Sequence, residues 1–380
     1  MHPVWVHLTD LPTPAAVIDA AILDRNCATM AERMTRLGVR LRPHVKTHKC
    51  VEIAKKQVAG HDAGVTVSTL PEARAMAAAG LTDITWAVPV PHPRMLEAIQ
   101  LHRDLAEQGG RLQLLVDHLD TVSLLSATAR LQGVVVPVFI KVDCGYGRAG
   151  VDPNGRALKA LAIRIEKASD LDLRGVLTHG GHSYDARNAD EIAVVAAEER
   201  DAIVHAAERL RVTSIPVPDV SLGSTPTMAV ATDLAGVTEA RPGNYALFDV
   251  FQASIGSCSL DDVALSVLVS VLGVYPERGQ LLVDGGALAF SKDAGATHTG
   301  ARGYGVVRTL EGAPLDLQLV GLSQEHGKVR GAPDVIAGFR PGDRLRVLPN
   351  HSCLVTALHP RLHVMVDDRI EDAWTPVRGW

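Results

Sequence analysis

Residues 39–49 have the sequence VRLRPHVKTHK, in which a short strand-like run, Val39–Pro43, leads into a basic loop that contains Lys46. Seven further runs of this kind follow before about residue 250, at Gly64–Ser68, Asp83–Val88, Leu112–Val116, Val136–Val142, Leu173–Thr178, Pro218–Ser221 and Gly236–Arg241. The stretches with helical spacing around and between them include Ala21–Leu37, Pro71–Ala79 and Asp185–Leu210. Eight strand–helix units of this length predict a TIM-type (β/α)8 barrel. A doubly wound open sheet is the main alternative, but no GxGxxG motif follows the first run.

After about residue 250 the pattern changes, because long helical stretches are missing and Gly and Pro interrupt the chain often. The strand-like runs here are Ala264–Tyr275, Gln280–Val283, Leu317–Leu322, Arg344–Leu348 and Leu362–Val366. This pattern predicts a mainly antiparallel β domain. We therefore expect an α/β barrel over residues 21–250, and a β domain over residues 251–380 together with residues 1–20.

The composition excludes several classes of protein. Among 380 residues, 47% are hydrophobic and 21% are charged, which argues against a disordered or fibrous chain. The net charge of −5 argues against a nucleic-acid partner. The longest apolar run, Ala264–Val274, is far shorter than the roughly 20 residues that span a bilayer, so we expect no membrane association. No signal peptide is visible, and five widely spaced cysteines without a CxxC pair favour a cytoplasmic location.

Lys46 lies just beyond the first strand, where barrels of this type place catalytic groups. A lysine there can form a Schiff base with an aldehyde cofactor if burial or neighbouring cations lower its pKa. The neighbouring cations are Arg42, His44, His48 and Lys49. The alternative interpretation is a solvated basic loop that opens the next helix.

Four further segments follow predicted strands and could serve a phosphate-bearing cofactor. Residues 221–227, SLGSTPT, and 241–245, RPGNY, follow the seventh and eighth strands, the usual phosphate site of this architecture. Residues 141–150, KVDCGYGRAG, contain Arg148, and residues 178–184, THGGHSY, offer a His or a Tyr that could lie against a cofactor ring. Each segment alone is equally consistent with a tight turn or a polar barrel rim.

His351 and Cys353 form a possible metal site. Residues i and i+2 of an extended segment point to the same face, so an imidazole and a thiolate would converge there. This donor pair suits zinc or another borderline transition metal. The alternative is a buried cysteine beside a rim histidine. Because only two protein ligands are visible, water and the substrate would have to complete the shell.

Taken together, these segments resemble the fold-type III PLP enzymes, which include alanine racemase, over nearly the whole chain. The similarity is greatest to the D-serine dehydratase and D-threonine aldolase branch, and within it to the D-threo-3-hydroxyaspartate dehydratases. The residues that carry it are Pro12–Pro14, Arg42–Lys49, Gly223–Thr227, Arg241–Asn244, Val320–Gly327 and Pro349–Cys353.

The resemblance implies specific roles for these residues. It implies that Lys46 is the Schiff-base lysine, that Arg148 lies near the phenolic oxygen or ring of PLP, and that His351 and Cys353 bind a divalent metal such as Zn or Mn. It implies a ring contact from His179 or Tyr184. The residues that it places around the phosphate are Gly223, Ser224, Thr225, Gly243 and Asn244. It also implies a homodimer in which the β domain of one subunit closes over the barrel mouth of the other.

The implied activity is a PLP- and metal-dependent dehydratase, an ammonia-lyase that acts on a D-3-hydroxy amino acid. With D-threo-3-hydroxyaspartate the products would be oxaloacetate and ammonia, with Lys46 as the base and the metal assisting departure of the hydroxyl. D-serine dehydratase and D-threonine aldolase are alternatives, although the dehydratases carry His-x-Cys where aldolases tend to carry His-x-Asp. A racemase, a PLP-carrier protein and a PLP-independent barrel hydrolase fit the sequence less well. Candidate cations for a second substrate carboxylate are Arg42, His44, Arg148, His182, Arg302 and His326.

Overall fold

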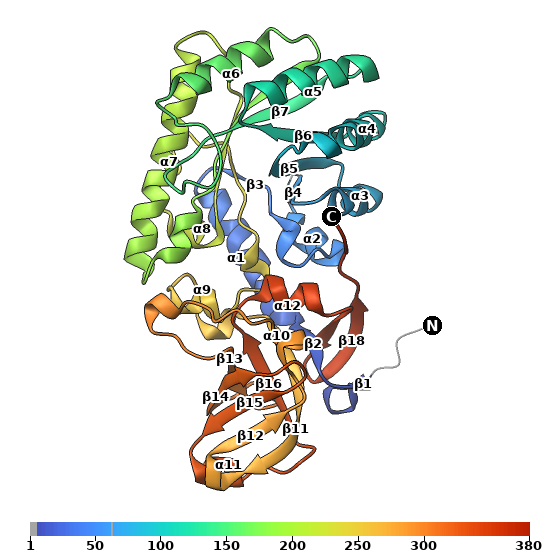
Figure 1. Ribbon diagram of the computed structural model, residues 1–380, viewed down its shortest axis with the longest axis vertical. Helices are drawn as coiled ribbons and strands as arrows, with labels where there is room; N and C mark the ends of the chain where they lie inside the picture. The colour runs from blue at the N-terminus through green and yellow to red at the C-terminus, as the bar shows by residue number, and fades with distance from the viewer. Residues whose placement is uncertain (1–5, 62–63) are drawn as a thin grey trace. The chain divides into compact units, whose positions relative to one another are not determined.

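The computed structural model describes residues 6–61 and 64–380 (Figure 1). The chain divides into two compact units. The first, called the β unit here, consists of Met1–Thr29, Thr47–Ile53 and Asn244–Pro376. The second, called the α/β unit, consists of Met30–Lys46, Ala54–Gly243 and Val377–Trp380. The long helix α1 (Ala20–Arg36) contributes residues to both units.

The α/β unit contains a parallel sheet of eight strands in the order β3-β10-β9-β8-β7-β6-β5-β4 (Figure 1). The strands are β3 (Arg40–Leu41), β4 (Val65–Val67), β5 (Asp83–Pro89), β6 (Arg111–Val116), β7 (Val136–Lys141), β8 (Leu171–Leu177), β9 (Asp219–Leu222) and β10 (Glu239–Ala240). All eight predicted strands are therefore confirmed, each within a few residues of its expected bounds.

The sheet is a half-barrel, whereas the sequence predicted a complete TIM-type barrel. Beyond β3, the chain meets β4 at one parallel bridge, between His44 and Thr66, with hydrogen bonds from the Thr66 N–H to the Pro43 carbonyl at 2.8 Å and from the Thr66 hydroxyl to the Arg42 carbonyl at 3.1 Å. The reason is local, because β3 and β10 are each two residues long and leave little backbone for a ladder.

Helices pack on this sheet and on one another in chain order. They are α3 (Leu70–Ala78), α4 (Met95–Ala106), α5 (Leu119–Gln132), α6 (Arg156–Glu166), α7 (Ala189–Arg211) and the short α8 (Thr225–Val230). Their ends follow the expected signals: Thr69 caps α3 by accepting a hydrogen bond from the Glu72 N–H, and Asn188 caps α7 in the same way. These caps fix where each helix begins, and therefore where the preceding strand-to-helix loop ends.

The β unit confirms the predicted antiparallel domain and adds a closed barrel that the sequence did not predict. Six strands form a ring in the order β11-β12-β15-β14-β13-β16, which closes because β11 also pairs with β16. They are β11 (Leu265–Tyr275), β12 (Gln280–Val283), β13 (Gly305–Arg308), β14 (Pro314–Leu322), β15 (Gly327–Gly331) and β16 (Arg344–Pro349). Strand β2 (Ala15–Asp19) extends this sheet from β11, followed by β17 (Leu362–Val366), β18 (Arg369–Trp374) and β1 (Val6–His7).

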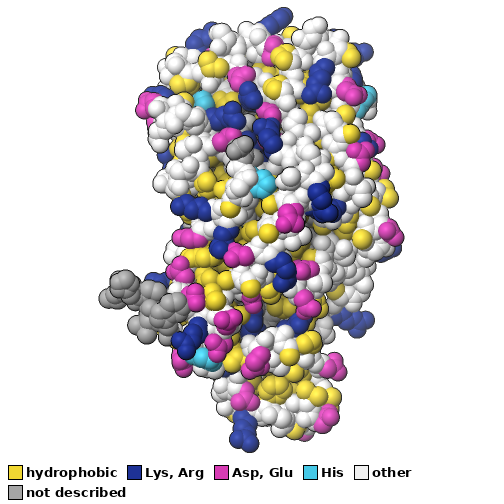
Figure 2. Space-filling view, turned by 180° about the vertical axis from the view of Figure 1, so that it is seen from behind, with side chains coloured by type: hydrophobic (Ala, Val, Ile, Leu, Met, Phe, Trp, Pro, Cys, Tyr) yellow, Lys and Arg dark blue, Asp and Glu magenta, His cyan; other side chains and the backbone are white. Residues whose placement is uncertain are grey.

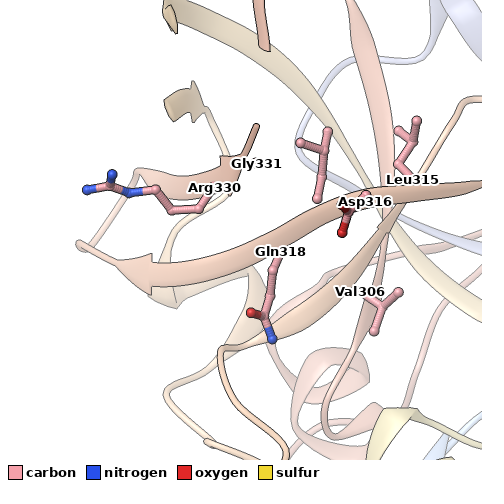
Figure 3. A pocket seen from close by; sticks show the side chains of 7 residues that line it. Val306, Leu315, Asp316, Gln318, Arg330 and Gly331 are labelled. Carbon is pink, nitrogen blue, oxygen red and sulfur yellow. The ribbon is translucent and has the colours of Figure 1, made fainter. Parts of the chain in front are cut away.

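Four short helices complete the β unit: α9 (Val250–Ser254), α10 (Ala287–Phe290), α11 (Pro333–Ala337) and α12 (Ser352–Leu358). Figure 3 shows a pocket of about 520 Å³ on strands β13, β14 and β15. Its lining residues are Val306, Leu315, Asp316, Leu317, Gln318, Arg330 and Gly331, and they include none of the predicted site residues.

Charged side chains of both signs lie on the surface (Figure 2), in keeping with the small net charge of −5. On the face drawn in Figure 2, Lys and Arg side chains are interspersed with Asp and Glu. Within residues 6–61 and 64–380, no helix is long and apolar enough to cross a membrane.

A buried ion network ties together the amino-terminal ends of the parallel strands. Arg42, which is 1% exposed, donates to the carboxylates of Asp83 (3.0 and 3.1 Å) and Glu239 (2.8 Å). Arg111 donates to both oxygens of Asp83 at 2.8 and 2.9 Å. Burial alone would raise the pKa of the Asp83 carboxyl, but the hydrogen bonds from Arg111 and the charge of Arg42 outweigh it and lower the pKa. Arg42, one of the candidate cations for a substrate carboxylate, is thus already paired.

We expect Arg42→Met to lower the free energy of unfolding by about 3–5 kcal/mol, because it leaves the buried Glu239 carboxylate without its cation. Urea unfolding measures the change. The control is Arg74→Met, since Arg74 and Glu97 form an exposed pair whose loss costs about 0–1 kcal/mol. Equal losses in the two variants would show that the buried pairing does not stabilise the sheet.

Candidate active site

Lys46 lies in a short 3-10 turn, Val45–Thr47, that follows β3. Its side chain is partly buried, and its backbone N–H points at Nδ1 of His44 at 3.4 Å. Arg42 and His48 on either side are buried. The segment is therefore not the solvated basic loop that was the alternative interpretation, although the charge of Arg42 belongs to the ion network rather than to Lys46.

His179 brings several predicted site residues together at the carboxyl end of the parallel sheet. The ring follows β8 and its Nδ1 donates to the Gly223 carbonyl at 3.3 Å. Burial lowers the pKa of His179 well below its usual value, and the charges of Lys46, Lys141 and Arg148 lower it further. Burial and these three charges thus favour the neutral form of the imidazole.

The loop after β9 and the turn after β10 also converge within the α/β unit. Gly223 has a φ of +116°, and a Cβ there would lie 3.0 Å from the backbone nitrogen of Arg241. Gly243 is tighter still, because its Cβ would lie 2.4 Å from the His44 carbonyl oxygen. Its N–H donates to the Thr225 hydroxyl at 3.2 Å, so the two segments are in direct contact. The close backbone approach requires glycine at both positions.

Asn244 is placed differently from the other predicted phosphate residues. Its side-chain amide lies in the β unit and donates to the Asp249 carboxylate and to the Ser352 hydroxyl, each at 2.9 Å. The same nitrogen is 3.9 Å from Sγ of Cys353. Its amide group is therefore occupied by the segment that carries the predicted metal ligands.

An aromatic residue that the sequence analysis did not single out lies beside His179. The ring of Tyr146 is 6.2 Å from the His179 ring at an interplanar angle of 82°, and Cζ of the exposed Arg148 lies 5.1 Å from the Tyr146 centroid. Gly145 and Gly147, with φ of +108° and +71°, turn the backbone on either side of it. Tyr184, the predicted alternative to His179, lies partly buried in the turn Gly181–Asp185.

Two buried cations were also missed. Lys141 ends β7 and is 6% exposed; Arg241 follows β10, is 4% exposed, and donates to the Ser221 hydroxyl and the Thr178 carbonyl. Burial, and then the charge of Arg241, lowers the pKa of Lys141 to about 7. Burial lowers the pKa of Arg241 to about 10. The available signal was a charged residue at the end of an apolar strand, which marks the active edge of a parallel barrel.

The predicted metal ligands meet in the β unit by a geometry other than the expected one. His351 is the residue before helix α12 and Cys353 lies in its first turn, so the segment is not an extended strand. Burial would raise the pKa of Cys353, but its hydrogen bond with His351 and the charge of that ring lower it. The two side chains are thus adjacent, and the lowered pKa of Cys353 favours the thiolate form that binds metals.

Asp293 orients His351. Its carboxylate accepts a hydrogen bond from Nδ1 of His351 at 2.8 Å, so Nε2 is the nitrogen that could bind a metal. Burial would lower the pKa of His351, but the hydrogen bonds to Asp293 and Cys353 raise it to about 11. Within the part of the chain that the structure describes, no group of three or more His, Cys, Asp or Glu side chains could hold a metal ion.

Comparison with known proteins places these features in a family. Residues 18–249 match the N-terminal domain of alanine racemase, which is more than half of the chain. The chain belongs to the alanine racemase N-terminal domain family. Residues 264–365 match a domain family that is named for serine dehydratase. Membership in this fold-type III family implies PLP.

Two curated relatives cover almost the whole chain. D-threo-3-hydroxyaspartate dehydratase of Delftia sp. (strain HT23) is 42% identical over 98% of this chain and 99% of its own length. D-serine dehydratase of Dictyostelium discoideum is 32% identical over 98% of both. A solved D-threo-3-hydroxyaspartate dehydratase C353A mutant in the metal-free form has a TM-score of 0.94 at 40% identity, and covers 99% of this chain and 100% of that one.

We expect the stability of the cofactor-free protein to rise between about pH 7 and about pH 10, because of Lys141. An unfolded lysine has a pKa of about 10.4, while that of the folded Lys141 is about 7. In that window the unfolded state binds more protons, so raising the pH favours folding. Lys141→Met should remove the rise and stabilise the protein by about 1–4 kcal/mol near neutral pH.

Denaturant unfolding at several pH values measures this slope. Lys159→Met, which changes an exposed lysine on α6, is the matched control and should keep the slope. A Lys141→Met variant with the wild-type slope would contradict the assignment.

Proposed function

We propose that this chain is a PLP- and divalent-metal-dependent dehydratase that converts D-threo-3-hydroxyaspartate to oxaloacetate and ammonia. The observation that carries the proposal is the pair Lys46-Thr47. The charge of Lys46 acts on His179 within the α/β unit, while the Thr47 hydroxyl lies 3.3 Å from Sγ of Cys353 within the β unit. Adjacent residues of the chain thus belong to the predicted cofactor site and to the predicted metal site. The 42% identical relative of the same name supports the substrate.

The residues of the α/β unit fit PLP. The cofactor brings a phosphate and a phenolate, and the two buried cations Lys141 and Arg241 favour an anion there. The buried carboxylate nearby, Glu199, is committed to backbone N–H groups. Lys46 would hold the cofactor covalently, Arg148 would face the phenolate, and His179 or Tyr184 would lie against the ring.

The close approach at Gly223 and Gly243 fits a phosphate, since the backbone N–H groups of these loops are not screened by a Cβ. Ser224 and Thr225 add hydroxyls. Because the Asn244 amide already donates to Asp249 and Ser352, we propose that its backbone rather than its side chain faces the phosphate.

PLP supplies an electron sink for the negative charge that forms at the substrate Cα when a proton leaves. In this chain the amine of Lys46 takes that proton. The neutral His179 ring contributes no second positive charge, because the neighbouring cations and burial keep its pKa low. The Gly145-Tyr146-Gly147 turn places the Tyr146 ring beside the same imidazole, and the Arg148 guanidinium lies against that ring.

The donor set of His351 and Cys353 fits zinc, manganese or a similar divalent ion, with water and substrate completing the shell. Such an ion supplies Lewis-acid assistance to the departing hydroxyl. Asp293 holds Nδ1 of the imidazole, so that Nε2 would be the nitrogen that binds the metal beside Cys353. Support comes from the solved C353A variant of the relative, described as metal-free, since residue type and number coincide with Cys353 here.

We also propose the wider organisation that the resemblance implies. The eight-stranded half-barrel within residues 21–250 would be the PLP-binding domain, with the His44–Thr66 bridge as its closure toward a TIM-type barrel, and the β domain of residues 251–380 with 1–20 would carry the metal ligands. Two copies would form a cytoplasmic homodimer. For the second substrate carboxylate, Arg148 is the better candidate than Arg42, because it has no acidic partner within the described residues and Arg42 is paired with Asp83 and Glu239.

Side-by-side assays of D-threo-3-hydroxyaspartate, D-serine and D-threonine test the function. We expect the purified protein to be yellow, to release ammonia and oxaloacetate from the first substrate fastest, and to form no glycine from the third. Lys46→Ala should lose both the colour and the activity, since it removes the base and the covalent attachment. Glycine and an aldehyde from D-threonine would favour an aldolase, and preference for D-serine would favour a D-serine dehydratase.

Removal of the metal should leave the yellow colour and abolish ammonia release, because the hydroxyl is a poor leaving group without a Lewis acid. Asp293→Asn should weaken metal affinity by about 10–100-fold, since it disturbs the partner of a ligating histidine. Chelator titration followed by metal add-back measures both effects. Full activity after complete removal of the metal would rule out its role in hydroxyl departure.

A further inference from the structure

Glu199 is a buried carboxylate that joins two loops of the predicted cofactor site. It lies on α7, outside the segments that the sequence analysis assigned to the cofactor and metal sites, and is 0% exposed. Its Oε1 accepts hydrogen bonds from the Gly180 N–H at 2.6 Å and from the Gly223 N–H at 3.0 Å. Its Oε2 accepts one from the Thr227 hydroxyl at 2.8 Å.

Glu199 is a buried carboxylate whose charge is compensated by hydrogen bonds rather than by a cation. Burying a carboxylate costs several kcal/mol unless hydrogen bonds or a cation compensate. Within residues 6–61 and 64–380, Glu199 forms no ion pair, so donors on two separate loops provide the compensation. The positive charges of Lys141 and Arg241 act on it only from further away. The two loops therefore fix the position of the Glu199 side chain, and the side chain in turn links the two loops.

The same two loops carry the predicted contacts to opposite parts of PLP. Gly180 follows His179, which we assign to the ring, and Gly223 opens the loop that we assign to the phosphate. Two weaker links join these loops directly, from Nδ1 of His179 to the Gly223 carbonyl at 3.3 Å and between the hydroxyls of Ser183 and Ser224 at 3.0 Å. A Cβ at Gly180 would lie 3.0 Å from Cδ of Glu199, so the carboxylate is packed directly against the turn.

We propose that Glu199 is a positioning residue that sets the separation between the His179 turn and the Gly223–Thr227 loop, and thereby the affinity for PLP. This inference rests on the proposed function, because it takes these loops to be the ring and phosphate contacts. Glu199 acts through the loops and touches neither substrate nor reacting atoms. Its geometry, rather than its negative charge, is what the loops require.

Glu199→Gln and Glu199→Ala separate geometry from charge. Gln keeps an oxygen that can accept from Gly180 and Gly223, and it removes the charge; Ala removes every contact. We expect Glu199→Ala to bind PLP about 10–100-fold more weakly than the wild type and Glu199→Gln to remain within about threefold of it. The readout is the PLP dissociation constant of each full-length variant, obtained by fluorescence titration after removal of the cofactor. The KM for substrate at saturating PLP should stay unchanged.

Glu208→Ala is the matched control, since Glu208 is an exposed carboxylate on the same helix, and the variant should leave the dissociation constant at the wild-type value. If Glu199→Ala does not fold, Thr227→Val removes the contact to Oε2 of Glu199, together with the bonds between the Thr227 hydroxyl and Ser224 of the same loop, and should weaken PLP binding by about 3–10-fold. Wild-type affinity in the folded variants would overturn the proposal, and so would a Gln variant as weak as the Ala variant. A wild-type protein that binds no PLP would instead refute the proposed function.

Discussion

The pairing of Arg42 with two buried carboxylates is the constraint on which the rest of the site depends. Arg42 follows β3 and holds Asp83 and Glu239, which begin β5 and β10. An unpaired charge in this position would cost several kcal/mol, so the strand ends are tied to one arrangement. The turn that carries Lys46 begins three residues later. The position of this turn is thus determined by an ion network that takes no part in the chemistry.

At the carboxyl ends of the same strands, buried positive charge predominates over buried negative charge. Within the described residues, Lys141 and Arg241 are buried without a carboxylate in ion-pair contact. Two buried acids act on them, but Glu199 is bonded to two N–H groups and a hydroxyl, and Glu239 is bonded to Arg42 and the Ser221 hydroxyl. A protein interior that keeps such an excess of positive charge is poised for an anion. A phosphate-bearing cofactor satisfies this requirement, and the same charges keep the His179 ring neutral.

The β unit brings the side chains of two predicted ligands, two residues apart in the chain, next to each other. The extended geometry expected from their spacing is wrong, since His351 precedes helix α12 and Cys353 lies inside it. Asp293, 58 residues earlier in the chain, sets the orientation of the imidazole instead. No local pattern around His351 could have indicated this partner, because it depends on how the six-stranded ring closes.

The sequence alone determined the eight parallel strands, the antiparallel character of the second half and the motifs around Lys46, His351 and Cys353. These features are local: hydrophobic periodicity, turn residues and short motifs lie within a few residues of one another. The tertiary structure decided the closure of β11 on β16, the half-barrel form of the parallel sheet, the separate placement of the Asn244 amide and the roles of Tyr146, Lys141, Arg241 and Glu199. Each of these depends on contacts between residues far apart in the chain, and on burial, which changes the cost of a charge and has no counterpart in a linear pattern.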